Sequence, residues 1–271
     1  MAEEARRSAG AALGHDLILG LGLILGLTFG LSAAPAAAQQ EAGHAASVCD
    51  VPADQFTSPV SLPHVAAALK KSDKKLNILT IGSPIGVGRG PRKSYSAALE
   101  SLLEKALTGI DVIIVNRPVS GEIAATAAER IKTEVALSRP DLLIWQVGAN
   151  DALARVPPAQ FEEALGEGVR WAKGAGIDVL LIGFEANPWL HDDQQARAIR
   201  DATAKVAQAE NVAYLRRYDA MQFIARTRSR VEQGDQPFPA QVGDECMAEL
   251  VAKALVANIV LRRTRPAPLD P

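Results

Sequence analysis

Short apolar runs recur along the chain from residue 76 onward, and several of them stop at a turn residue. The first run, residues 76–81, is rich in branched side chains and is followed by Gly82, Gly86 and Gly88. Runs of about four to eight apolar residues bounded by turn residues are typical of strands buried on both faces. The same pattern predicts further strands at residues 111–115, 141–147, 177–184 and 212–215.

Apolar residues at helical spacing fill the segments between these strands. In residues 121–137, for example, Ile123, Ala127, Ile131 and Val135 fall on one face of a helix. Strands that alternate with helices predict an α/β fold, a parallel sheet of about five strands covered by helices on both faces. No internal repeat or linker divides residues 76–263, so we expect one domain there. The predicted helices are residues 94–107, 121–137, 158–173, 192–209, 218–231 and 244–261.

The first 38 residues have the three-part layout of a secretion signal. Residues 17–31 are apolar throughout, Arg6 and Arg7 precede them, and small residues follow at 33–38. Because the apolar run is shorter than the ~20 residues that span a bilayer, we expect cleavage after Ala38. The alternative is an uncleaved N-terminal anchor. In both cases the segment contacts the membrane during export, and the protein is expected to be periplasmic or extracellular.

Residues 39–75 are predicted to form an N-terminal arm. Pro52, Pro59 and Pro63 interrupt its periodicity, and only a short helix-like run follows at 64–71. Since such proline-rich stretches usually wrap a surface, we expect the arm to lie outside the core. The proline-rich residues 264–271 are expected to form a loose tail.

Charge and composition exclude two classes of partner. The net charge is −2 and aromatic residues make up only 4% of the chain. A nucleic-acid-binding domain needs a basic footprint, and a carbohydrate platform lined with rings needs many aromatic residues. Neither kind of surface is therefore expected, and nucleic acid is not a predicted partner.

The chain has two cysteines, Cys49 in the arm and Cys246 in the last predicted helix. An exported protein meets an oxidising compartment, where an even pair of cysteines commonly forms a bridge. We therefore predict a disulfide that joins the arm to the last helix. The alternative is two unrelated buried thiols.

Three of the predicted strand ends carry polar motifs. They read G-S-P at residues 82–84, N-R-P-V-S-G-E at 116–122 and G-A-N-D at 148–151. In this order and spacing they resemble the SGNH (GDSL) hydrolases, in particular the exported bacterial members, over residues 49–261. The resemblance implies a flavodoxin-like, three-layer α/β/α fold. It also implies ester hydrolysis by a serine, a histidine base with its aspartate, and an oxyanion hole.

The sequence departs from this family at the positions that carry the chemistry. The nucleophile position, two residues after Gly82, is Pro84, which has no hydroxyl. The position matched to the glycine that donates a backbone N–H to the oxyanion is Pro118, which has no N–H. Loss of one such donor typically costs ~10²–10³ in rate.

The base is also missing. When residues 235–238 are aligned with the family D-x-x-H motif, Asp235 is kept and the base position becomes Phe238. An alternative register at 244–247 also lacks histidine, and no histidine follows His191 in the chain. The loss of the base therefore does not depend on the register.

Asn150, with Gly148 beside it, is the clearest remnant of the family set. Asn150 and Asp151 have a functional interpretation, an oxyanion donor with a neighbouring acid. Their structural interpretation is a polar strand end that holds the surrounding loops. With the nucleophile gone, we favour the structural interpretation.

Other candidate residues have simpler explanations. Ser83 is a displaced nucleophile or an ordinary turn serine, and Ser120 is explained as a local cap at a helix start. His191 stands beside two acids, but the spacing matches no metal signature. The glycines that follow residue 81 lack the lysine and the spacing of phosphate-binding loops. No metal and no cofactor are therefore expected.

Three functional hypotheses follow from the sequence. The preferred one is an exported, catalytically degenerate SGNH-like protein that binds a ligand or a partner in the cell envelope. The second is an active hydrolase of esters or acetylated glycans that uses unorthodox residues such as Ser83 with His191. The third is a purely structural envelope protein.

Overall fold

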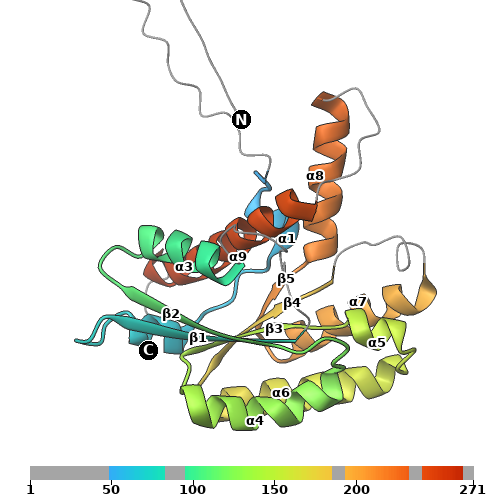
Figure 1. Cartoon of the computed structure of the whole chain (residues 1–271), viewed down its shortest axis with the longest axis horizontal. Coiled ribbons are helices and arrows are strands. Elements are labelled where there is room, and N and C mark those ends of the chain that lie inside the picture. The colour runs from blue at the N-terminus through green and yellow to red at the C-terminus, as the bar shows by residue number, and fades with distance from the viewer. Residues whose placement is uncertain (1–48, 83–94, 185–192, 232–239, 265–271) are drawn as a thin grey trace, which may run out of the picture. The chain divides into compact units, whose positions relative to one another are not determined.

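Five parallel strands form one sheet, in the order β2-β1-β3-β4-β5 (Figure 1). The computed structural model describes residues 49–82, 95–184, 193–231 and 240–264. This strand order is the flavodoxin-like doubly wound order, so the predicted fold class is confirmed. The strands are β1 (Lys75–Gly82), β2 (Asp111–Pro118), β3 (Leu142–Gln146), β4 (Asp178–Ile182) and β5 (Ala213–Leu215).

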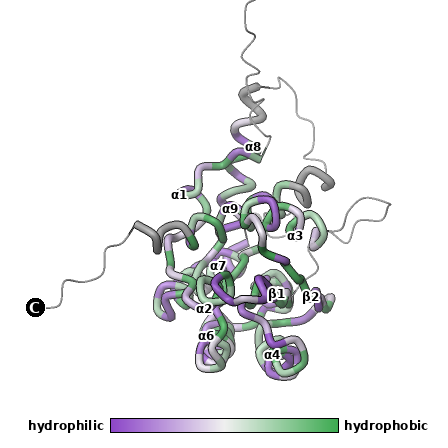
Figure 2. The backbone as a smooth tube through the Cα atoms, turned by 90° about the vertical axis from the view of Figure 1, so that its left-hand side faces the viewer, coloured by the Kyte–Doolittle hydropathy of each residue, from purple (hydrophilic) through white to green (hydrophobic). Residues whose placement is uncertain are grey.

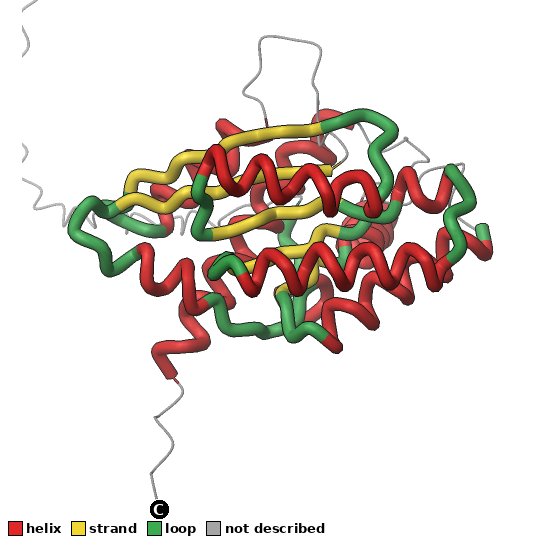
Figure 3. Tube along the Cα trace, turned by 90° about the horizontal axis from the view of Figure 1, so that it is seen from below, coloured by secondary structure: helices red, strands yellow, loops and turns green. Residues whose placement is uncertain are grey.

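Helices cover both faces of the sheet, as Figures 1 and 3 show. The helices α3 and α9, with the short α1 and α2 and the first turns of α8, share one apolar core with the sheet. The helices α4, α6 and α7 share the other. The helices are α1 (Ala53–Phe56), α2 (Pro63–Ala68), α3 (Tyr95–Ala106), α4 (Ala124–Ser138), α5 (Ala149–Leu153), α6 (Pro158–Gly174), α7 (Gln194–Ala209), α8 (Arg217–Val231) and α9 (Ala240–Thr264).

The central strands β3 and β4 are buried along their whole length. Successive side chains alternate between the two cores, so that Ile144 joins one and Trp145 the other. Figure 2 shows that α4 and α6 carry both hydrophobic and hydrophilic residues, as expected for helices with one face on the sheet. The core is therefore formed by strands that are apolar along their whole length and by the apolar faces of the helices.

The N-terminal arm is part of this core, which corrects the expectation that it wraps the surface. Phe56, Leu62 and Val65 are buried in the same cluster as the sheet. The Val65 N–H donates to Asp178 Oδ2 (2.8 Å), and the Arg216 N–H donates to the Phe56 carbonyl (2.7 Å). The apolar side chains of the arm fill the core from a mostly irregular backbone. They therefore show no helical or strand periodicity in the sequence.

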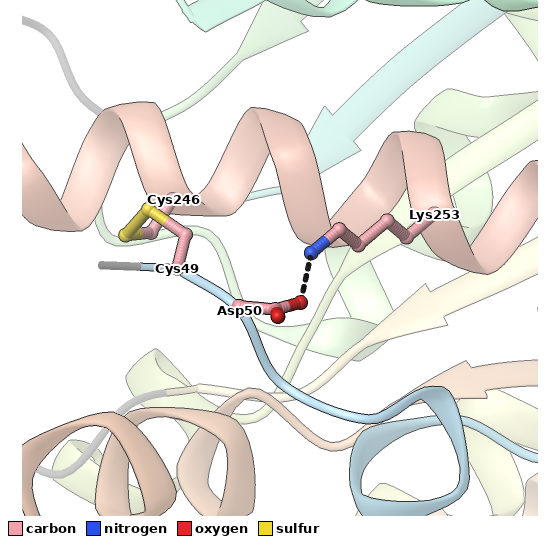
Figure 4. Close-up of a disulfide and its surroundings, with 4 residues drawn as sticks. All are labelled: Cys49, Asp50, Cys246 and Lys253. Atoms are coloured by element: carbon pink, nitrogen blue, oxygen red, sulfur yellow. Dashed lines mark hydrogen bonds and ion pairs between the residues drawn. A yellow bond between two sulfur atoms is a disulfide. The ribbon is translucent and has the colours of Figure 1, made fainter. Parts of the chain in front are cut away.

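The predicted disulfide between Cys49 and Cys246 is confirmed. The bond joins the arm to α9, and the two Cα atoms lie 5.0 Å apart (Figure 4). Both cysteines are buried against the core that α3 and α9 share. Asp50 and Lys253 connect the same two segments through an ion pair of 3.1 Å.

Several element boundaries differ from the predicted ones. β2 continues through Asn116 to Pro118 because its backbone pairs with β1 as far as Gly82. α4 begins at Ala124, so Ser120 lies in the preceding turn and does not cap the helix. α5, which has no apolar periodicity of its own, was not predicted. α9 starts at Ala240, four residues before the expected Asp244.

The predicted secretion signal at 1–38, the first residues of the arm and the tail beyond Thr264 lie outside the described residues. Among the helices that the structure describes, none is both long enough and apolar enough to cross a membrane.

Candidate functional site

The carboxyl ends of β1, β2 and β3 lie side by side because the three strands are parallel neighbours. β1 ends at Gly82, β2 ends at Pro118, and Gly148 and Asn150 follow β3 directly. Ligands of open parallel sheets bind at this edge. The remaining predicted site residues lie outside the described residues: Ser83, Pro84, His191, Asp235 and Phe238.

Gly82 closes β1 in a conformation and a space that suit only glycine. Its φ is +103°, and a Cβ at this position would lie 2.0 Å from the carbonyl oxygen of Gln146 on β3. In the sheet register Gly82 faces Gln146 on one side and Pro118 on the other. The first residue of the G-S-P motif therefore has a structural role, which is to let β1 end in close contact with the backbone of β3.

Pro118 is the last residue of β2, where a missing N–H is tolerated because β2 is an edge strand. The N–H of Val119 donates to the Gly82 carbonyl (3.1 Å), and the chain then turns at Gly121, whose φ is +78°. The amide of Asn150 meets the backbone of Glu122, at the end of this turn. Gly121 is the neighbour of Glu122, the residue that Asn150 contacts, whereas Pro118 lies further back along the chain. The assignment of the oxyanion position to Pro118 therefore stays a prediction.

Asn150 and Asp151 hold the loop between β2 and α4. Asn150 Nδ2 donates to the Glu122 carbonyl (2.8 Å), and the Ala124 N–H donates to Asp151 Oδ1 (2.9 Å). Asp151, only 2% exposed, therefore caps α4, whose own N-cap residue, Ile123, provides no side-chain acceptor. Burial raises the pKa of Asp151, while the backbone N–H groups around it act in the opposite direction. The G-A-N-D motif thus fixes the neighbouring loop.

A bidentate ion pair reinforces the same loop. Arg130 Nε and Nη2 donate to the two carboxylate oxygens of Glu122, at 2.7 and 2.6 Å. Arg130 Nη2 also donates to the Arg117 carbonyl (3.0 Å), and Arg117 Nε donates to Glu134 (3.2 Å). Charge-assisted, bidentate pairs are the strong form of this contact. Sequence reasoning missed this group, although Arg130 and Glu134 stand four residues apart on α4; Arg117 and Glu122 come before that helix.

A polar hollow lies beneath the strand ends, on the side of the sheet that faces α3. Its polar lining residues are Thr80, Asn116, Tyr95 and Gln146, and the Thr80 hydroxyl donates a hydrogen bond to Asn116 Oδ1. Tyr95 OH and Gln146 Oε1 are buried there without a hydrogen-bond partner among the described residues. Burial raises the pKa of Tyr95, and the charge of Arg217 acts in the opposite direction. The hollow of about 10 Å³ has room for about one water molecule, so a ligand would bind above it.

Within the described ranges, no three His, Cys, Asp or Glu side chains come close enough together to hold a metal ion. The polar groups at this edge are instead amides, hydroxyls and ion-paired side chains.

Asp151→Ala should lower the free energy of unfolding by about 1–3 kcal/mol, because the buried N–H of Ala124 loses its acceptor. Urea unfolding followed by circular dichroism measures this loss. Since the pKa of Asp151 is raised, the wild type loses stability as the pH rises through that pKa. The deficit of the variant should therefore be larger at a pH close to the ordinary Asp pKa of about 4 than at pH 7.

Asp193→Ala is the matched control. Asp193 caps α7 by accepting from the Ala196 N–H (2.9 Å) and also pairs with Arg155 (2.8 Å), but its side chain is 18% exposed, so water can replace the lost contacts. Its loss should cost clearly less than that of Asp151. Equal losses of unfolding free energy in the two variants would show that the burial of Asp151 does not determine the strength of its cap.

Comparison with known proteins gives one family match and several relatives. The model of the Non-GDSL lipase-like family matches residues 48–261. Esterase TesA of Pseudomonas aeruginosa is 31% identical over 113 residues, which cover 41% of this chain and 55% of that protein. An arylesterase of Vibrio mimicus is 25% identical over 194 residues, which cover 71% of this chain and 94% of that protein.

A solved structure shares the fold. The crystal structure of TesA superposes with a TM-score of 0.51 and 26% identity, covering 66% of this chain and 97% of that one. The matched segment of the Pseudomonas esterase spans just over half of its length, whereas the structural match spans nearly all of TesA. The three-layer fold expected from the strand-end motifs is thereby confirmed.

Proposed function

This chain belongs to the Non-GDSL lipase-like family, and on that premise we propose that it is an exported SGNH-type protein that binds a ligand or partner and does not hydrolyse esters. The binding surface in this proposal is the carboxyl edge of the sheet, where Gly82 ends β1 and Gly148 and Asn150 follow the end of β3. The place of action is the cell envelope.

The observation that carries the proposal is the joint absence of nucleophile and base. Pro84 stands where the family has serine, and Phe238 stands where the D-x-x-H alignment requires histidine. A serine nucleophile works only when a base removes its proton and later protonates the leaving group. Because such residues act as a unit, Asn150 and Asp235 alone supply no route to hydrolysis.

The contacts of Asn150 and Asp151 support this proposal. Both side chains bond to the backbone of the loop between β2 and α4, and the Arg130 pair with Glu122 holds the same loop. These contacts give the G-A-N-D motif a structural role that requires no reaction. A rigid edge of this kind suits ligand binding, since less ordering entropy is lost when the ligand binds.

The disulfide supports the exported location. Disulfides persist in oxidising compartments and are rare in the cytosol. The bond between Cys49 and Cys246 begins eleven residues after the predicted cleavage at Ala38. The signal and the disulfide therefore point to the same compartment.

Fluorophosphonate labelling of the purified mature protein, read by intact mass, tests the loss of serine-hydrolase chemistry. We expect no adduct in protein shown to be folded by circular dichroism, while an active serine esterase treated in parallel is labelled stoichiometrically. An adduct that disappears in the Ser83→Ala variant would contradict the proposal, because it would demonstrate an activated serine.

The alternative is an active ester or acetyl-glycan hydrolase that uses Ser83 with His191. It is favoured by the names of the relatives, one an esterase and the other an arylesterase. Hydrolysis of p-nitrophenyl acetate that falls together in Ser83→Ala and His191→Ala would establish this alternative. Hydrolysis no faster than that of buffer agrees with the main proposal.

A further inference from the structure

Arg200 of α7 lies over two aromatic rings at the carboxyl edge of β4 and β5. Its Cζ atom is 4.1 Å from the ring centroid of Tyr218 and 5.6 Å from that of Phe184. Phe184 follows β4 by two residues, and Tyr218 lies in the first turn of α8, just after β5. We call Arg200, Phe184 and Tyr218 the arginine clamp. It links α7 on one face of the sheet to α8 on the other (Figure 1).

The guanidinium in this clamp has an unused donor. Nη1 of Arg200 is buried and has no hydrogen-bond partner among the described residues, although the side chain as a whole is only partly buried. A buried donor without an acceptor is costly, and one in a native structure calls for an unseen water or ion. Other arginines of the domain pair with carboxylates: Arg130 with Glu122, Arg155 with Asp193, Arg170 with Glu210, and Arg216 with Asp219.

The clamp packs directly against the candidate site. A Cβ placed on Gly148 would lie 3.0 Å from the ring of Phe184 and 3.0 Å from Cγ2 of Ile199, the residue before Arg200. Gly148 in turn precedes Asn150 by two residues. Through Phe184 and Ile199, the clamp therefore adjoins Gly148, from which the turn that carries Asn150 begins.

We propose that Arg200 is the anion-recognising residue of this site, so that the ligand carries a carboxylate or phosphate group. The inference rests on the proposed ligand-binding function and names the class of ligand. Cation–π contacts with two rings restrain the position of the guanidinium. Its N–H edges then match the paired oxygens of a carboxylate or phosphate.

Nuclear magnetic resonance of the ¹⁵N-labelled protein tests this assignment at the side-chain Nε–H of Arg200, identified by its absence in Arg200→Lys. Sodium acetate, sodium phosphate and, as a neutral control, acetamide are titrated at constant ionic strength. We expect a saturable shift of the Arg200 signal with acetate or phosphate and none with acetamide. The anion that binds more tightly distinguishes a carboxylate ligand from a phosphate ligand.

Two further variants test the role of the clamp. Tyr218→Leu should weaken the affinity for the anion by about two- to five-fold through loss of the stacked ring, whereas Tyr218→Phe should retain it. Arg226 is an exposed arginine on the same helix as Tyr218, and its Nε–H signal should not shift with either anion.

The proposal is overturned if neither anion shifts the Arg200 signal saturably, because its acceptor then lies within the protein. It is also overturned if Arg226 responds equally. These outcomes are independent of the labelling experiment. An adduct at Ser83 together with a shift at Arg200 would refute the proposed loss of catalysis and support the anionic ligand. No adduct together with no shift would support the loss of catalysis and refute the anionic ligand.

Discussion

Gly82→Ala should lower the free energy of unfolding by about 2–5 kcal/mol, or prevent folding. A residue with a Cβ pays about 1–2 kcal/mol for the left-handed conformation, and overpacking against a fixed neighbour adds about 1–3 kcal/mol. The neighbour here is the backbone oxygen of Gln146 on the buried strand β3, at 2.0 Å, and it cannot rotate away. Thermal and urea unfolding of the purified variant measure the loss.

Gly109→Ala separates the two causes. Gly109 also has a positive φ, +81°, but a Cβ there would meet nothing within 4 Å. This control should lose only the conformational part, about 1–2 kcal/mol. If both variants lost the same amount, the close approach of β1 to β3 at Gly82 would be irrelevant, and the motif glycine would need another explanation.

Replacing Cys49 and Cys246 together by alanine should lower the free energy of unfolding by about 3–5 kcal/mol. The disulfide closes a loop between residues 197 positions apart, so its loss frees a large number of unfolded conformations. For a domain of this size the melting temperature should fall by roughly 10 °C. Calorimetry of the double variant, and of the wild type with and without reductant, measures both quantities.

Lys253→Ala is the matched control for the disulfide. Lys253 links α9 to Asp50, the residue next to Cys49, but through an exposed ion pair (Figure 4). Such pairs contribute about 0–1 kcal/mol, so the melting temperature should hardly change. A loss in Lys253→Ala as large as in the double cysteine variant would mean that docking of the arm on α9, and not the covalent loop, provides the stability.

Local chemistry along the chain is enough to predict much of this fold. Branched apolar runs such as residues 76–81 form strands, and residues spaced like Ile123, Ala127 and Ile131 form helices, because each pattern suits one backbone geometry. The alternation of strands and helices then leaves few topologies, since crossover connections between parallel strands are right-handed. The disulfide was also predictable, because the chain has only two cysteines and its first 38 residues have the layout of a secretion signal.

The burial of the arm could not be predicted in this way. Phe56 and Leu62 stand among prolines without periodicity, and only the assembled sheet shows that they fill its core. β2 extends to Pro118 for a similar reason, since pairing with β1 overrides the tendency of N-R-P to end a strand. Secondary structure that depends on a distant partner carries no local signal.

For the candidate site, the sequence by itself determined which groups are present: the motif glycines, Asn150 and Asp151, and no histidine after His191. The placing of Pro84 at the nucleophile position and of Phe238 at the base position stays a prediction of the motif alignment. Only the tertiary structure decided what those groups do. Asp151 caps a helix that begins 27 residues earlier in the chain, and Arg200 meets rings 16 and 18 residues away. The physical reason is that hydrogen bonds and ring stacking depend on separations of a few ångströms, which the packing of helices on the sheet creates between residues far apart in sequence.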